Sequence, residues 1–376
     1  MTNTIAAPKS REKARNGCIF WQPLRALPIF CELYSGDEDV LRQARLLFAP
    51  CRDAPCLNAK NEQGRAFAVW RWNVEKDEDV WRVCDFDSGE TFSGDLQRVL
   101  MRIEYSIVQR LVEAVRREDA QNLATPLFAM HAALLEKDGF GIVIVGPSES
   151  GKSTLTCALW QNGWTIASDD FCFVQGEQVF PAARRVSLRR GSRALLGEEV
   201  WNLVQKAPSS APTSEGLIFH PHQVRLNEAD ANPEVPARDA VTIRAILFLG
   251  RLDPLSTTQT PAAQSEMANK EASELVENGA VAVRFCNPAR AALALLPYCT
   301  LVRAASDDDS HSYRVLDWGK ALPKIAPLMS RVPVLRMARG ELAQMVAAVE
   351  NLAAEICAAS SRTPEALARE LRWEKG

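Results

Sequence analysis

The sequence lacks a membrane-spanning segment and a secretion signal. None of its 376 residues belong to an apolar run of the about 18 residues that a bilayer-spanning helix requires. The first 17 residues are polar and do not contain the apolar core of a signal peptide. We therefore predict no membrane partner, and we expect residues 1–18 to form a disordered leader.

The cysteines and the charged residues also lack informative clusters. The ten cysteines are scattered, with no CxxC pair and no Cys/His group at zinc-binding spacing. A disulfide framework is not expected in a chain of this length, so we interpret the cysteines as reduced core thiols of a cytoplasmic protein. The 44 Lys and Arg residues alternate with 47 Asp and Glu residues, for a formal net charge of -3. Because there is no basic block, we predict no nucleic-acid partner.

The length of the chain is sufficient for two domains, each with its own core. We predict a smaller N-terminal α+β domain at residues 19–122, a P-loop domain at 123–357 and a C-terminal tail at 358–376. In the first domain, aromatic and β-branched residues at 65–72 predict a strand, and Gly94-Asp95 precedes an amphipathic helix. Polar residues at 118–122 are interpreted as the linker. This domain carries no functional motif, and the sequence leaves its role and the oligomeric state open, a homo-oligomer included.

Apolar runs and turn residues alternate in the second domain. Residues 127–135 and 141–145 are expected to form the two strands of a hairpin around Asp138-Gly139, a favourable turn dipeptide. A helix is predicted to end at Gly163, and further strands are predicted at 165–167, 171–174, 179–186 and 243–249. A C-terminal helix is expected at 341–356. The alternation of strands and helices predicts an α/β fold.

The strongest motif in the sequence follows the strand 141–145 and matches G-x-x-x-x-G-K-[ST]. Glycines in such a loop let backbone amides form a concave nest for phosphates, and the following helix adds its positive end. Lys152 can neutralise the β- and γ-phosphates, and the Ser153 hydroxyl can ligate Mg²⁺. The motif predicts ATP or GTP as the nucleotide. We take ATP and Mg²⁺ as the cofactors and predict a nucleotide site formed by Gly146, Pro147, Ser148, Glu149, Ser150, Gly151, Lys152, Ser153 and Thr154.

Two adjacent carboxylates, Asp169 and Asp170, follow the strand predicted at 165–167. Adjacent carboxylates in a sheet are costly unless they hold a metal or face water. Strand ends in an open α/β sheet point toward the ligand crevice. One carboxylate could therefore bind Mg²⁺ while the other orients or deprotonates an acceptor hydroxyl. The alternative is an acidic turn without a function.

His131 lies on the strand before the loop, between Met130 and Ala132, where a lone histidine is more often a core residue. Counting back from the turn at Asp138-Gly139 places it near the end of the hairpin where Val145 leads into the loop. We therefore predict that His131 lies at the phosphate end of the site, where a neutral imidazole could hydrogen-bond a hydroxyl or a carboxylate.

The segment 131–174 resembles the core of HPr kinase/phosphorylase and of related kinases, including peptide-modifying kinases. His131 lies 15 residues before Gly146, and the aspartate pair lies 17 and 18 residues after Lys152, which matches the order and spacing in that family. The resemblance implies the α/β fold that HPr kinase shares with phosphoenolpyruvate carboxykinase. It also implies catalytic roles for His131, Lys152, Asp169 and Asp170, with Asp170 as the base.

The sequence departs from this family in one metal-binding segment. In the family a metal-binding carboxylate lies just before an Arg-Gly pair, whereas Leu188-Arg189-Arg190-Gly191 contains none. Asp169, Glu198 or Glu199 could replace it, or the metal site could be impaired; we predict Ser153 and Asp169 as the metal ligands. The remaining HPr-recognition signature is missing, so HPr itself is not the expected substrate.

The expected function is a kinase that transfers the γ-phosphoryl of ATP to a hydroxyl, with Ser or Thr of a protein or peptide as the acceptor. Basic residues Arg184, Arg185, Arg189 and Arg190 could contribute positive charge. A small-molecule kinase with the same core, and a nucleotide-binding regulator with little catalysis, remain alternatives. The loop also resembles that of ABC-type ATPases, but the LSGGQ-like signature of those proteins does not occur in this sequence.

Overall fold

The computed structural model divides into two compact units, and the division falls between Gln109 and Arg110. Helix α2, Leu96–Asp119, is continuous across this point. Each unit is described by itself below. The structure describes residues 17–22, 29–47, 52–53, 68–119, 127–182, 185–221, 224, 240–250, 281, 283–299, 302–303, 313–314 and 318–358.

The first unit contains a six-stranded sheet in the order β3-β1-β2-β4-β5-β6. β2 and β4 run parallel, and the other neighbouring strands run antiparallel. Helix α1 follows β2, and α2 follows β6. The bounds of the strands and of the first helix are β1 Gly17–Gln22, β2 Ile29–Ser35, α1 Glu38–Leu47, β3 Arg52–Asp53, β4 Ala68–Asp77, β5 Val80–Asp85 and β6 Thr91–Gly94.

Local sequence signals in the first unit agree with several of these elements. The predicted helix after Gly94-Asp95 is confirmed as α2, and the Asp95 carboxylate accepts a hydrogen bond from the backbone N–H of Arg98 at 2.9 Å. This is the N-cap interaction that favours aspartate at a helix start. The apolar stripe of α2 is buried at Leu100 and Leu111. The strand predicted at 65–72 corresponds to β4, whose described residues extend to Asp77.

Three predicted boundaries differ from the structure. β1 begins at Gly17, so the last two residues of the predicted leader pair with β2, while residues 1–16 lie outside the described residues. Residues 118–119 of the predicted linker belong to α2, because the helical pattern of this segment continues without a breaking residue. The predicted tail begins at Ala358, which is the last residue of α9, and its other residues lie outside the described ones.

The second unit is built on a nine-stranded mixed sheet. Seven strands follow the order β10-β8-β9-β16-β12-β11-β7, and β20 and β17 extend the sheet from β16. At its centre β16 runs parallel to both β9 and β20. The bounds are β7 Leu127–Met130, β8 Ala132–Lys137, β9 Phe140–Val145, β10 Thr165–Ser168, β11 Cys172–Gln175, β12 Gln178–Pro181, β16 Val241–Leu249, β17 Val283–Phe285 and β20 Val334–Met337.

Smaller sheets and helices complete the second unit. A three-stranded sheet contains β13 Val186–Arg189, β14 Ala211–Pro212 and β15 Gly216–Phe219. A two-stranded sheet contains β18 Val302–Arg303 and β19 Tyr313–Arg314. The helices are α3 Lys152–Gln161, α4 Ser192–Leu196, α5 Glu198–Gln205, α7 Pro288–Leu295, the 3-10 helix η3 Leu296–Tyr298, α8 Trp318–Met329 and α9 Leu342–Ala358.

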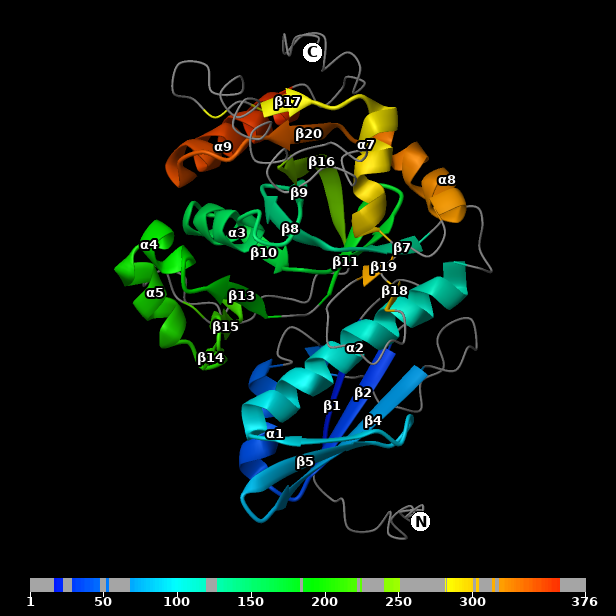
Figure 1. The fold of residues 1–376 in the computed structure, drawn as a ribbon, viewed down its shortest axis with the longest axis vertical. Helices are drawn as coiled ribbons and strands as arrows, with labels where there is room; N and C mark the ends of the chain where they lie inside the picture. Colours follow the sequence, from blue (N-terminus) through cyan, green and yellow to red (C-terminus); the bar gives the residue numbers. More distant parts are fainter. Residues whose placement is uncertain are drawn as a thin grey trace, which may run out of the picture. The chain divides into compact units, whose positions relative to one another are not determined.

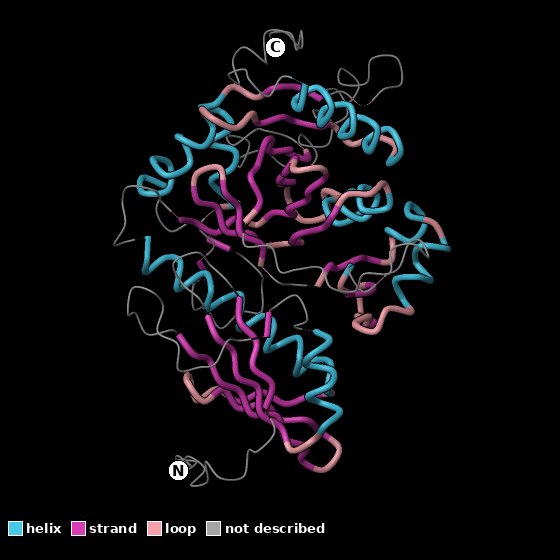
Figure 2. Tube along the Cα trace, turned by 180° about the vertical axis from the view of Figure 1, so that it is seen from behind, coloured by secondary structure: helices cyan, strands magenta, loops and turns pink. Residues whose placement is uncertain are grey.

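Helices cover both faces of the central sheet of this unit (Figure 1). Along β9, Ile142 and Ile144 belong to one hydrophobic cluster, which includes residues of α3 and α9. Val143 and Val145 belong to the opposite cluster, which includes residues of α7 and α8. Figure 2 shows the same helix and sheet layers from behind. Strands covered on both faces need continuous apolar runs, which explains why 141–145 contains no polar residue.

The turns around the first strands of this unit form as the sequence predicts. Asp138 and Gly139 have φ angles of 51° and 77° and join β8 to β9, with Ala132 opposite Val145 in the register. Positive φ at both positions is what a two-residue type I′ turn requires. Gly163 has a φ angle of 85° and ends α3, with its N–H and that of Trp164 bonded to carbonyls of the last turn.

Two predicted strands are divided in the structure. The apolar run 127–135 breaks at His131, because β7 pairs with β11 whereas β8 pairs with β9. The run 179–186 forms the end of β12 in the large sheet and the start of β13 in a different, three-stranded sheet. Pro181, the last residue of β12, lacks the N–H that further pairing needs. The mixed α/β class is as predicted.

Two expectations from composition bear on the whole described chain. Within the described residues, no helix combines the length and apolar character that crossing a membrane requires. The cysteines described there have free thiols; Cys31, Cys157, Cys172 and Cys299 are buried, whereas Cys357 is exposed.

Candidate functional site

The predicted phosphate-binding loop connects β9 to α3, the strand-loop-helix context that its motif requires. A Cβ atom at Gly146 would lie 2.7 Å from the Leu249 carbonyl oxygen and 2.8 Å from Ser150 Oγ, so only glycine fits there. Gly151 caps α3 with a φ angle of 94°, a conformation that favours glycine. Glu149, inside the loop, also has a positive φ angle of 65°. The backbone geometry therefore explains why both motif positions are glycine.

Lys152 is nearly buried at the first turn of α3. Its Nζ donates hydrogen bonds to the carbonyl oxygens of Gly146 at 2.7 Å and of Pro147 at 3.1 Å. Burial lowers the pKa of the Lys152 ammonium, and the carboxylates of Asp170 and Asp169 oppose this effect. The Lys152 ammonium, the only cation of the loop, is thus held by the carbonyl oxygens of the loop itself.

Asp169 is a buried carboxylate directly after β10. The Ser153 hydroxyl donates to it, with Oγ 3.1 Å from Oδ2 and 3.4 Å from Oδ1. The backbone N–H of Ser187, on β13, donates to the same Oδ2 at 3.3 Å. The strand end and the start of α3 therefore bring together the two residues predicted as metal ligands.

Asp170 and His131 form a second pair in the site. His131 Nδ1 lies 3.2 Å from Asp170 Oδ1, and Asp170 has a φ angle of 78°. His131 lies between β7 and β8. Its backbone N–H donates to the Tyr298 carbonyl at 2.7 Å, and its ring packs edge-on against Phe171. The sheet thus places the histidine beside the aspartate pair, at the end of β9 that leads into the loop.

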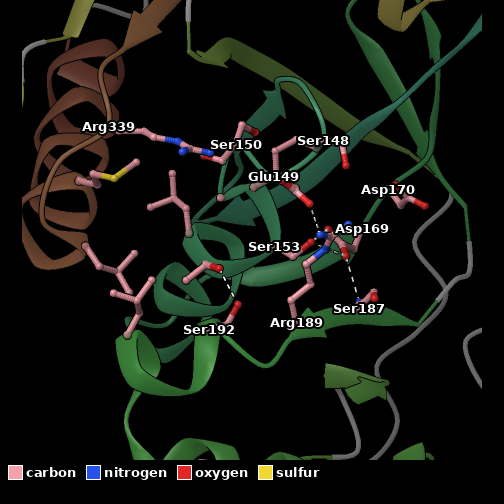
Figure 3. A pocket seen from close by; sticks show the side chains of 18 of the residues that line it. Ser148, Glu149, Ser150, Ser153, Asp169, Asp170, Ser187, Arg189, Ser192 and Arg339 are labelled. Atoms are coloured by element: carbon pink, nitrogen blue, oxygen red, sulfur yellow. Dashed lines mark hydrogen bonds and ion pairs between the residues drawn. The ribbon is translucent and has the colours of Figure 1, made fainter. Parts of the chain in front are cut away.

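A cavity of about 720 Å³ contains these groups. His131, Lys152, Asp169 and Asp170 all line it, as do the loop residues from Ser148 to Thr154. Figure 3 shows the loop residues with Asp169 and Asp170 on one side and Arg339 on the other. Gly146 and Pro147 are not part of the lining, and they act on it through the carbonyls that hold Lys152.

Charged residues from other elements also contribute to the lining. Arg189, at the end of β13, forms ion pairs with Glu149 of the loop and, at 3.4 Å, with Glu215. Arg339, between β20 and α9, donates from Nε to the Ser150 carbonyl at 3.2 Å. Positive charge therefore lies on both sides of the loop.

Sequence reasoning missed most of the lining residues outside the loop, among them the polar Ser187, Glu215 and Arg339. Ser187 and Glu215 lie on or beside short strands that no motif marks, and Arg339 is distant from the loop in the sequence. A basic residue at a strand end is too common a signal to identify Arg339. Arg189 was one of four arginines proposed to contribute charge, and it is the one among the described residues that lines the cavity.

Two suggested metal carboxylates do not reach the site. Glu198 and Glu199 are exposed in the first turn of α5, outside the cavity lining, and Glu198 pairs instead with Arg193. Among the residues that the structure describes, no three His, Cys, Asp or Glu side chains form a metal-binding group. Of the other arginines, Arg185 and Arg190 are outside the lining, and Arg184 is not among the described residues.

Comparison with known proteins gives no family assignment. No protein-family model matches the chain, and no curated protein matches it significantly.

Proposed function

We propose that this chain is an ATP-dependent kinase of the HPr-kinase and phosphoenolpyruvate-carboxykinase type, which transfers the γ-phosphoryl group to a hydroxyl with Mg²⁺. The acceptor class is Ser or Thr of a protein or peptide. One observation carries the proposal: a phosphate-binding loop, a Ser–Asp pair and an Asp–His pair line a single cavity. The resemblance of the segment 131–174 to HPr kinase supports the same assignment.

The loop residues fit a nucleoside triphosphate. The loop ends at the N-terminus of α3, where backbone N–H groups are available to phosphates. Gly146 is required sterically, Gly151 is favoured by its positive φ angle, and the Lys152 ammonium is already desolvated. The Ser150 hydroxyl is buried and has no hydrogen-bond partner among the described residues, so it is a free donor inside the loop. These features are what a site for several phosphate oxygens needs.

The Ser153–Asp169 pair fits a hard divalent cation, because hydroxyl and carboxylate oxygens are the ligands that Mg²⁺ prefers. Ser153 and Asp169 would hold the ion, and Asp169 would also fix the Ser153 hydroxyl in place. When bound, Mg²⁺ would supply charge neutralisation for the phosphates.

Asp170 and His131 suit the acceptor side of the reaction. In the proposed step, the acceptor hydroxyl oxygen bonds to the γ-phosphorus, the bond from that phosphorus to the bridging oxygen breaks, and ADP leaves. The Asp170 carboxylate accepts the hydroxyl proton, and Lys152 stays on the phosphates. His131, at 3.2 Å from Asp170, orients that carboxylate and acts as a positioning residue.

A nucleotide-binding regulator with little transferase activity is the second candidate. It is favoured by the small number of carboxylates near Ser153. Glu149 and Glu215 pair with Arg189, and among the described carboxylates only Asp169 contacts the Ser153 hydroxyl. A small-molecule kinase would use the same residues, and the choice of acceptor distinguishes it from a protein kinase.

The test is a transfer assay with ATP labelled on the γ-phosphate, Mg²⁺ and a panel of Ser- and Thr-containing peptides and small alcohols. We expect labelled peptide and ADP in equal amounts, and loss of both in Asp170→Asn. Labelled alcohols without labelled peptides would identify a small-molecule kinase. ATP binding without any ADP release would contradict the kinase proposal and favour the regulator.

A further inference from the structure

One wall of the cavity carries apolar side chains beside the charged Arg339 and Glu341, and the proposed chemistry does not use the apolar ones. Leu195 of α4 lines this wall together with Leu342 and Met345 of α9. Leu195 is 62% exposed, more than any other large hydrophobic residue described. A lone exposed leucine is ordinary, but a leucine that shares a concave wall with two other apolar side chains is typical of a ligand site.

Specific contacts hold this wall beside the loop. The hydroxyls of Thr154, in α3, and Ser192, in α4, lie 2.8 Å apart. On the α9 side, Arg339 is bonded to the Ser150 carbonyl, as described above. A Cβ atom at Gly340 would lie 2.4 Å from Val281 Cγ2, so the chain approaches its neighbour closely where it enters α9. Both helices that carry the apolar side chains are therefore tied to the phosphate-binding loop.

The apolar wall and the aspartate pair lie on different sides of the loop (Figure 3), although Glu341, next to Leu342, also lines the cavity. Figure 3 shows Ser192 and Arg339 across the loop from Asp169 and Asp170. The terminal phosphates and the acceptor belong on the acidic side, where Lys152 and both aspartates lie. A nucleotide held in this direction extends its nucleoside away from the aspartates and toward α4 and α9.

We propose that Leu195, Leu342 and Met345 bind the base of a purine nucleoside triphosphate. The inference rests on the proposed function, because the phosphates must occupy the loop. A purine offers two flat apolar faces, and a methionine thioether makes favourable contacts with aromatic rings. The cavity volume of about 720 Å³ lies within the range of small-molecule sites and leaves room for a base besides the phosphates.

The test compares ATP with inorganic tripolyphosphate, which has the phosphates without the nucleoside. Affinities are measured by calorimetry, with Mg²⁺ present, for the wild type, Leu195→Asn and Leu293→Asn. Leu293, in α7, is a matched control, because it is an exposed leucine that does not line the cavity. Asparagine is neutral, so the substitution does not add charge near the phosphates.

In Leu195→Asn we expect the ATP affinity to fall about tenfold, the effect of removing a leucine-sized apolar contact. Tripolyphosphate affinity should stay within about twofold, and Leu293→Asn should match the wild type with both ligands. Unchanged ATP affinity, or an equal loss with both ligands, would overturn the base site. If the wild type binds neither ligand, the proposed function itself fails.

Discussion

Two connections in the second unit contain an aspartate with a positive φ angle, for different reasons. Asp138, in the turn between β8 and β9, has a φ angle of 51°, and Asp170, between β10 and β11, has one of 78°. A left-handed conformation costs a residue with a side chain about 1–2 kcal/mol, although aspartate tolerates it better than most. The type I′ hairpin explains Asp138 completely.

No hairpin explains Asp170. β10 pairs with β8, whereas β11 pairs with β7 and β12, so the connection does not join two paired strands. Its conformation instead accompanies a carboxylate 3.2 Å from His131 in the cavity lining. Strained residues that local geometry does not require are characteristic of functional sites. A positive φ angle is therefore structural at Asp138 and points to function at Asp170.

The largest expected effect is on turnover in Asp170→Asn. Loss of the proposed base should lower kcat by about 10²- to 10⁴-fold. Asparagine also tolerates the left-handed conformation, so the free energy of unfolding should change by less than about 1 kcal/mol. Asp138→Asn is the matched control, with kcat expected to be unchanged. Steady-state kinetics and denaturant unfolding measure both quantities. Equal kcat values in the two variants would contradict the proposed role of Asp170 as the base.

Lys152→Ala should weaken Mg·ATP binding about 100-fold, because a desolvated, charge-assisted contact with phosphate contributes several kcal/mol. Lys137→Ala is the control in the hairpin region, since Lys137 pairs with Glu350 and does not line the cavity. Calorimetry should show wild-type affinity for the control. If folded Lys152→Ala bound Mg·ATP as tightly as the wild type, the loop would not be the phosphate-binding site.

Asp169→Asn should separate the two neighbouring carboxylates. Asp169 holds the Ser153 hydroxyl, and loss of such a supporting partner typically reduces metal affinity or activity about 10- to 100-fold. We expect the Mg²⁺ concentration for half-maximal turnover to rise about tenfold, while excess Mg²⁺ restores part of kcat. A variant with an unchanged Mg²⁺ requirement and no turnover would mean that the two aspartates have exchanged roles.

A smaller effect is expected for His131→Gln. The imidazole positions Asp170, so kcat should fall about tenfold while KM for ATP and the melting temperature change little. His220→Gln provides the contrast, because His220 is buried outside the cavity lining. That substitution should lower the melting temperature and leave kcat nearly unchanged. Matching stability losses in both variants, with no selective loss of turnover, would make His131 a core residue.

The smallest effect is expected at the turn itself. Glycine adopts a positive φ angle without strain but loses more entropy on folding, so the two terms should nearly cancel in Asp138→Gly. We expect the free energy of unfolding to stay within about 1 kcal/mol of the wild type, with unchanged turnover. Thermal unfolding and kinetics check this prediction, and a loss of turnover would show that the hairpin is coupled to the site.

The parts of the site that could be predicted are those with local sequence signals. The glycines and Lys152 of the loop, the Asp138-Gly139 turn and the helix end at Gly163 each depend on the conformational preferences of neighbouring residues. The register of the hairpin then places His131 near the loop, and this too follows from counting residues.

The remaining parts depend on tertiary pairing, which leaves little trace in a single sequence. Whether 127–135 stays one strand is decided by its partners β11 and β9, which belong to different parts of the sheet. Arg339 reaches the loop because β20 lies parallel to β16, and Ser187 reaches Asp169 because β13 joins a separate small sheet. Isolated polar residues of this kind are too common to be distinguished by type or spacing.

Nucleotide binding by the loop is tested most directly by a calorimetric titration of the folded wild-type chain with Mg·ATP. We expect saturable binding at one site per chain, with an affinity between about 1 μM and 1 mM, the range in which enzymes usually bind their substrates. Tripolyphosphate added first should reduce the heat, because both ligands occupy the loop. No binding at millimolar Mg·ATP, in a protein shown to be folded, would contradict the account.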